Sequence, residues 1–140
     1  MPCPPTPWFR KTIVTMLLGL ALTPVVAGAT TPIEWRCGWF ENPTPGNATL
    51  TDRDGEWDIG TQGGHQADGD WPEFADAQWV DTNGHHGYGC ACLSVTTDPQ
   101  ARTVLSIHKA IARPLAICRA DPRLHEPAHE SDETDSGAAR

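Results

Sequence analysis

Basic side chains are scarce in this sequence, and their scarcity argues against whole classes of partner. Ten Lys and Arg residues stand against 18 Asp and Glu residues, which gives the 140-residue chain a formal net charge of −8 at pH 7. Nucleic acids and anionic membranes are bound through clusters of basic side chains. We therefore expect neither a nucleic-acid-binding protein nor a protein held on an anionic membrane surface.

The familiar catalytic and cofactor-binding motifs are absent as well. The chain contains no G-x-S-x-G sequence, no P-loop, no H-E-x-x-H pair and no dinucleotide-binding glycine pattern. Nor does it contain an internal repeat or a heptad pattern. No cofactor is therefore expected, and an enzyme is not the favoured interpretation.

Long apolar runs are confined to the start of the chain. Arg10 and Lys11 precede the run TIVTMLLGLALTPVVAGA, which ends in the small residues AGA. A charged start, an apolar stretch and a small-x-small end are typical of a secretory signal peptide. The stretch is short for a membrane span of about 20 residues, and Pro24 interrupts it. We expect residues 1–29 to be a cleaved signal peptide, no membrane span to remain, and the mature protein to be periplasmic or secreted.

Large apolar side chains are also absent from the end of the chain, EPAHESDETDSGAAR. A polar and charged stretch of this kind cannot bury enough apolar surface to fold. Residues 125–140 are therefore predicted to be a disordered acidic tail, which leaves residues 30–124 as a single domain. The core of such a small domain gives little stability by itself, so covalent links between segments are useful.

The cysteine count indicates such links. Cys3 leaves with the signal peptide, and Cys37, Cys90, Cys92 and Cys118 remain. An even number of cysteines in a small exported domain is typical of a disulfide framework. A bond between Cys90 and Cys92 would close a strained ring within a strand. Cys37 is therefore expected to pair with one of these two residues and Cys118 with the other, and the sequence does not choose between the two arrangements.

A zinc site is the alternative for the stretch GHHGYGCACLSV. Zinc sites usually separate paired cysteines by two or more residues, whereas Cys90 and Cys92 have one residue between them. His85 and His86 are adjacent, and adjacent residues on a strand point in opposite directions. A redox pair would be expected within a thioredoxin-like βαβ pattern, which is missing. We therefore favour disulfides.

Alternating residues predict a β-rich fold. Residues 88–97 and 103–109 flank the turn sequence TTDPQAR and are expected to form a hairpin. Cys90 and Cys92 would then lie on one face of its first strand. The opposite, apolar face is predicted to consist of Leu93, Val95, Leu105 and Ile107.

Further strands and turns follow from the same patterns. Trp35, Cys37 and Trp39 alternate in a short first strand that ends at NPTPG, and ATLTDRDGEWDIGTQGG reads as a hairpin. GGHQADGDWPEF is expected to be a loop, AQWV a strand, and Asn83-Gly84 a tight turn. Proline limits any helix in HKAIARPLAICRADPRL to about two turns. The predicted fold is all-β or β-rich α+β: a small, disulfide-linked antiparallel domain with long Gly/Pro loops and at most one short C-terminal helix.

Acidic and tryptophan residues suggest a recognition surface. Nine acidic residues lie between Asp52 and Asp81, with Arg53 as the single Lys or Arg among them, and five of the six tryptophans follow the signal peptide. An exposed surface of this composition suits a carbohydrate or a basic protein. The candidate residues are Trp39, Trp57, Asp68, Asp70 and Trp71. A non-enzymatic binding module for a protein or glycan partner is the favoured interpretation.

Two other interpretations place chemistry on the acidic residues. Asp52, Asp54, Glu56 and Asp58 offer oxygen ligands for calcium, although the full EF-hand pattern is missing. A small envelope hydrolase is the second alternative, because paired carboxylates cleave glycosidic bonds. Its candidate residues are Asp68, Asp70 and Glu73, near Trp71.

Four stretches carry a resemblance to a known family: RCGWFENPTPGNATLTDRDGEWDIGTQGG, GDWP, NGHHGYGCACLSV and PLAICRADPRL. In these stretches, from about Arg36 to Leu124, the chain resembles a bacterial family of small exported domains of unknown function. The patterns RCGWF…NPTP, DRDGEW and GYGCACL are the most specific. The resemblance implies export and a single domain, and it implies no activity, ligand or catalytic residue.

Overall fold

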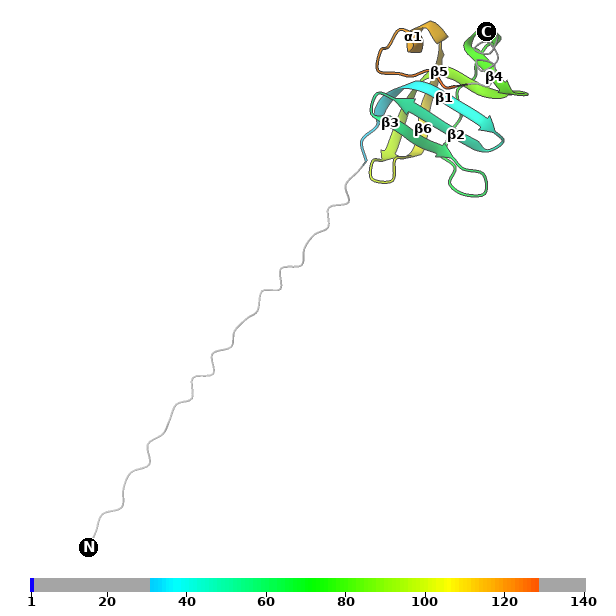
Figure 1. The fold of residues 1–140 in the computed structure, drawn as a ribbon. Coiled ribbons are helices and arrows are strands. Elements are labelled where there is room, and N and C mark those ends of the chain that lie inside the picture. Colours follow the sequence, from blue (N-terminus) through cyan, green and yellow to red (C-terminus); the bar gives the residue numbers. More distant parts are fainter. Residues whose placement is uncertain (2–30, 129–140) are drawn as a thin grey trace, which may run out of the picture.

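The computed structural model describes Met1 and residues 31–128, which form a strand-rich domain with one short helix (Figure 1). The strands are β1 (Glu34–Thr44), β2 (Asn47–Asp52), β3 (Gly55–Gly60), β4 (Trp79–Asn83), β5 (His86–Asp98) and β6 (Thr103–Arg113). A 3₁₀ turn, η1 (Asp76–Gln78), precedes β4, and the helix α1 (Leu115–Arg119) follows β6. The predicted signal peptide lies almost wholly outside the described residues, as do residues 129–140 of the predicted tail.

The strands form one sheet that closes on itself. Its order is β1-β2-β3-β6-β5-β4, and β1 also pairs with β5, so β4 is an addition to a ring of five strands. Neighbours are antiparallel, except that β3 and β6 meet in parallel at Asp58 and Thr103. Partly open five-stranded barrels such as the OB-fold share this general architecture, which hosts many functions. The predicted disulfide-linked β domain with one short C-terminal helix is confirmed.

The seam between β3 and β6 is filled by the loop that follows β3. Ala67 N–H donates to Ile59 O (2.8 Å), and Asp68 exchanges backbone hydrogen bonds with β6 at Leu105 O (3.1 Å) and Ile107 N–H (2.7 Å). Gly69 comes next with φ +98°, and a Cβ there would lie 2.1 Å from Ile107 O. Glycine is therefore required where the loop leaves the edge of β6.

The apolar core follows the alternation of the strands. Its buried members are Phe40, Ala48, Leu50, Trp57, Ile59, Ala91, Leu93, Val95, Val104 and Ile107. One predicted core residue is wrong: Leu105 is 41% exposed, whereas Val104 is fully buried. Thr96 lies opposite Ser106 and Thr97 lies opposite Val104, so Leu105 is the extra residue of a β-bulge. A bulge changes which residues face the core, and strict alternation cannot anticipate it.

The disulfides lie on the outer face of the sheet, opposite the core. Cys37 of β1 lies directly across from Cys92 of β5 and is bonded to it, with a Cα–Cα distance of 4.0 Å. Cys90 lies across from Trp39 instead, and it is bonded to Cys118 of α1. The register of β1 against β5 thus resolves the choice that the sequence leaves open.

The second disulfide holds α1 over a second buried cluster. Trp39, Tyr88, Cys90 and Cys118 are its buried members. Tyr88 OH donates to Glu126 Oε1 (3.0 Å), and Arg119 Nε donates to Glu126 Oε2 (2.8 Å). Burial and the bond to Glu126 together raise the pKa of Tyr88 to about 12. Glu126 belongs to the stretch predicted as a tail, so the packed part of the chain reaches at least to this residue.

Removing the Cys90–Cys118 bond should release α1 while the barrel stays folded. In a Cys90→Ala/Cys118→Ala protein, we expect the free energy of unfolding to fall by about 3–4 kcal/mol, because the bond closes a long loop. Iodide quenching of tryptophan fluorescence should increase as Trp39 loses its cover, and urea unfolding measures the stability. A Cys37→Ala/Cys92→Ala protein is the matched control, with a similar loss of stability but no added quenching. Equal quenching in both proteins would show that Cys118 does not hold α1.

Candidate functional site

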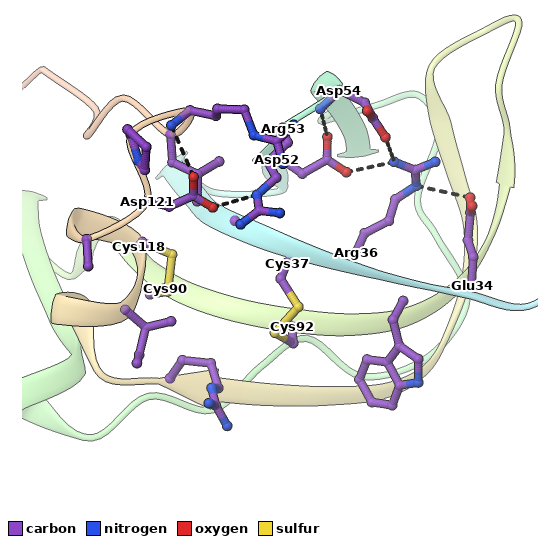
Figure 2. Close-up of a pocket in the computed structure, with 18 residues that line it drawn as sticks. Glu34, Arg36, Cys37, Asp52, Arg53, Asp54, Cys90, Cys92, Cys118 and Asp121 are labelled. Atoms are coloured by element: carbon purple, nitrogen blue, oxygen red, sulfur yellow. Dashed lines mark hydrogen bonds and ion pairs between the residues drawn. A yellow bond between two sulfur atoms is a disulfide. The ribbon is translucent and has the colours of Figure 1, made fainter.

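A groove of about 710 Å³, which we call the disulfide groove, lies over the outer face of β1 and β5 (Figure 2). Both disulfides line it, and its walls come from the β2–β3 turn, from α1 and from the segment that follows α1. Trp35 and Ile117 add apolar surface to the groove, with 55% and 50% of their area exposed. Its charged groups decide whether it is a binding site.

Half of the groove's eight charged residues form one cluster around Arg36. Arg36 Nη1 lies 2.7 Å from Asp52 Oδ2 and 3.2 Å from Asp54 Oδ2, and its Nε lies 3.0 Å from Glu34 Oε1 (Figure 2). The guanidinium also stacks on Trp57, 3.7 Å from the ring centre. Asp52 in turn accepts a hydrogen bond from Trp57 Nε1 (3.2 Å). Since the side chains of Arg36 and Asp52 are only 11% and 7% exposed, this cluster fills one end of the domain rather than presenting it to a ligand.

A second ion pair joins the two walls of the groove. Arg53 Nε, from the β2–β3 turn, lies 2.6 Å from Asp121 Oδ2, which follows α1 (Figure 2). This pair links segments that are far apart in the sequence. The hydrogen bond from the Arg123 backbone and the one from Arg53 lower the pKa of Asp121. The ionic groups of the groove thus bind chiefly one another.

The acidic hairpin does not assemble the calcium site that its sequence suggests. The carboxylates of Asp52 and Asp54 bind Arg36, and Asp58 accepts a hydrogen bond from Thr61 (3.2 Å). Glu56 precedes the buried Trp57 on β3, so its exposed side chain lies on the opposite face of that strand. Within residues 31–128, no three His, Cys, Asp or Glu side chains lie close enough together to hold a metal ion. The guanidinium of Arg36 therefore binds the carboxylates that were predicted to bind calcium.

The zinc alternative at the C-x-C sequence is wrong. Cys90 and Cys92 are both in disulfide bonds, with Cys118 and Cys37 respectively, and therefore offer no thiolate. His85 is an exposed residue of the turn before β5, and His86 begins that strand. Neither histidine has a thiolate available to complete a metal site.

A second hollow, of about 440 Å³, is lined by aromatic rings. Phe40 and Trp71 lie 5.7 Å apart between ring centres, Phe40 and Phe74 5.8 Å, and Phe74 and Trp79 4.9 Å. Offset and edge contacts at such distances hold aromatic rings in fixed positions. The volume falls in the range of about 300–1,000 Å³ that is usual for ligand sites. We call this feature the aromatic hollow.

The polar rim of the aromatic hollow differs from that of the groove. Asp76, Asp81 and His85 line it, all three are exposed, and within residues 31–128 their side chains form no hydrogen bond or ion pair. They come from η1, β4 and the β4–β5 turn, which lie together because β4 pairs with β5. Unpaired acceptors beside fixed rings are what a polar ligand with an apolar face requires.

The predicted recognition surface is corrected at two residues. Trp39 is 0% exposed and lies under α1, and Trp57 is 2% exposed and lies under Arg36, so neither can bind a partner. Trp71 is half-buried in the aromatic hollow. Asp68 and Asp70 are exposed on the same loop, where Asp68 pairs with β6 through its backbone.

The aromatic hollow also contains residues that the sequence did not single out for binding. Phe74, Asp76, Asp81 and Trp79 come together only in the folded chain, where the loop after β3 lies against Phe40 of β1 and Trp79 of β4. The spacing of Trp71, Phe74 and Trp79 is a usable signal, since it places three rings within nine residues next to acids. Glu73, named with Asp68 and Asp70 for a hydrolase, is exposed and lines a different hollow.

The Arg36 cluster should make stability fall in acid. The pKa of Glu34 is lowered below its usual 4.5, chiefly by the hydrogen bond from Thr97. Burial opposes this shift, and the contact with Arg36 adds to it. A lowered carboxyl pKa stabilises the fold above 4.5, and that contribution is lost as the pH falls through the folded value. We expect Glu34→Gln to reduce the free energy of unfolding by about 0.5–1 kcal/mol at pH 7 and to have little effect at pH 3. Urea unfolding at both pH values measures this, with Glu56→Gln as the exposed control. A loss that is equally large at pH 3 would contradict the charge argument.

Of three comparisons with known proteins, one identifies a family for this chain. A search of curated proteins finds no match, and a search of solved structures finds none either. Within the described residues, no helix is long and apolar enough to cross a membrane. A family model for proteins of unknown function (DUF4087) matches residues 31–125, which include every strand and the helix. The chain therefore belongs to this family of proteins of unknown function.

Proposed function

We propose that the protein is an exported, non-enzymatic module that binds glycans in the aromatic hollow. Export is supported by the two disulfides, which persist in oxidising compartments, and by the signal-peptide pattern of residues 1–29. The observation that carries the binding role is the contrast between two hollows. All four carboxylates of the disulfide groove are paired with arginine side chains, whereas the carboxylates of the aromatic hollow are free to accept hydrogen bonds.

The geometry favours a sugar over other small ligands. A sugar ring has an apolar face, which stacks on aromatic side chains, and hydroxyl groups, which donate to carboxylates. Trp71 and Trp79 provide the rings, and Asp76 and Asp81 provide the acceptors. The rings belong to one connected set, in which Phe74 lies against Phe40 and Trp79, and the two carboxylates lie on the rim of the same hollow.

The charge of the site narrows the class of glycan. The aromatic hollow carries Asp76 and Asp81 and no Lys or Arg, and the whole chain has a net charge of −8. An acidic polysaccharide would be repelled, in the same way that nucleic acid is. The proposed ligands are therefore neutral sugars and amino sugars.

Isothermal titration calorimetry with three oligosaccharides tests this proposal. We expect cellohexaose or a chitosan oligomer to bind and an alginate oligomer to show no heat. Trp71→Ala should weaken binding about tenfold or more, equivalent to about 1.4 kcal/mol. Asp81→Asn removes an exposed charge without changing shape, and it should weaken the chitosan oligomer more than cellohexaose.

Trp35→Ala is the matched control for the loss of a tryptophan. Trp35 is 55% exposed and lines the disulfide groove, so its removal should leave sugar affinity unchanged. Absence of binding by both cellohexaose and the chitosan oligomer at millimolar concentration would refute the proposal, and so would binding of the alginate oligomer. So would equal weakening by Trp35→Ala and Trp71→Ala, which would place the sugar elsewhere.

A further inference from the structure

The C-terminal half of β6 has one edge that no strand covers. On its first edge, β6 pairs with β5 as far as Cys90 and Arg113. On its second edge, it meets β3 at Thr103 and the loop at Leu105 and Ile107. Beyond Ile107, within residues 31–128, no backbone or side-chain group is hydrogen-bonded to this second edge. Unpaired strand edges are sites where another chain can add a strand.

The geometry of the first disulfide identifies the free backbone groups. Cys37 and Cys92 have a Cα–Cα distance of 4.0 Å, which is typical of the narrow antiparallel pair that exchanges no hydrogen bonds. The N–H and C=O of Cys92 therefore point the other way, toward its partner Ile111 on β6. Because backbone direction alternates along a strand, the N–H and C=O groups of Ala110 and Ala112 point to the uncovered edge.

A slot of about 910 Å³ runs along this edge. One wall is β6 from Ile107 to Ala112, and the other consists of the loop, with Asp70 and Glu73, and Gln78 of η1. The carboxylates of Asp70 and Glu73 form no ion pair within the described residues, and neither does Lys109 on the β6 side. The side chains of Ala110 and Ala112 line the slot and are small. Two free carboxylates against one lysine leave the slot negative.

We propose that the slot binds an extended peptide segment of a partner protein, which pairs with β6 and carries basic side chains. The N–H and C=O groups of Ala110 and Ala112 would form a ladder with the peptide backbone, which is the β-augmentation mode of recognition. Asp70 and Glu73 on the facing wall select lysine or arginine, and the net charge of the chain assists the approach of a basic partner. This site is separate from the aromatic hollow, although Trp71 lines both.

Amide hydrogen exchange measured by NMR tests the proposal on the purified protein. The probe is a blocked octapeptide of alternating valine and lysine, and its counterpart has glutamate in place of lysine. At a lysine-peptide concentration of ten times its Kd, exchange at the Ala110 and Ala112 amides should slow about tenfold. The glutamate peptide should leave both amides unchanged.

Two sets of variants separate the backbone from the charges. Ala112→Pro removes one outward N–H without touching the bonds to β5, as proline permits at sheet edges, and it should abolish peptide binding. Ala112→Ser keeps the N–H and should bind normally. An Asp70→Asn/Glu73→Gln protein is altered only at exposed side chains. It should bind the lysine peptide about threefold more weakly. It keeps the test informative if the proline variant does not fold.

Several results would overturn the proposal. No slowing at Ala110 and Ala112, or equal slowing by the glutamate peptide, would exclude a basic peptide at this edge. Protection that is present without peptide would show that the chain itself covers the edge. Protection that grows with protein concentration would show that a second copy pairs there instead.

Discussion

The two-sided pairing of β5 is the constraint on which the rest of the structure depends. One edge of β5 is bonded to β1, and the other is bonded first to β4 and then to β6. With both edges occupied from Gly87 to Val95, each of these residues of β5 has a fixed face. Ala91, Leu93 and Val95 point into the core, while Cys90 and Cys92 point outward. A shift of one residue would exchange these sets, burying the cysteines and exposing the core. The disulfides therefore report the register and also lock it.

The sequence predicts what is local and misses what depends on distant pairing. Alternation at Trp35, Cys37 and Trp39, and the C-x-C spacing, give the faces correctly, because a strand's period needs no partner. The choice of disulfide partner needs the register between β1 and β5, which are separated by more than forty residues. The bulge at Leu105 belongs to a hairpin whose turn was predicted, yet only the paired strands show which residue is extra.

Tryptophan shows the same limit in the candidate site. The search for tryptophans near acidic residues selects Trp71, which lies beside Asp76 and Asp81 in the structure. It also selects Trp39 and Trp57, which are buried. Their burial is set by groups far away in the sequence: α1 covers Trp39, and Arg36 and Arg102 stack on Trp57. Phe74 becomes part of the aromatic hollow only because Gly89 of β5 leaves room for it; a Cβ at that glycine would lie 2.5 Å from the Phe74 ring.

Both proposed binding sites arise where β5 changes partner. β4 lies opposite β5 up to Gly89, and β6 lies opposite it from Cys90 onward. Because β4 is short and β3 touches β6 at a single residue pair, the barrel stays open on this side, and the loop after β3 crosses the opening. That loop brings Trp71 and Phe74 against Phe40 and Trp79, and it also stops short of covering the edge of β6. The slot exists because no strand covers this edge of β6, and the aromatic hollow exists because the same loop lies against β1 and β4. The path of one loop thus shapes both candidate surfaces for recognition.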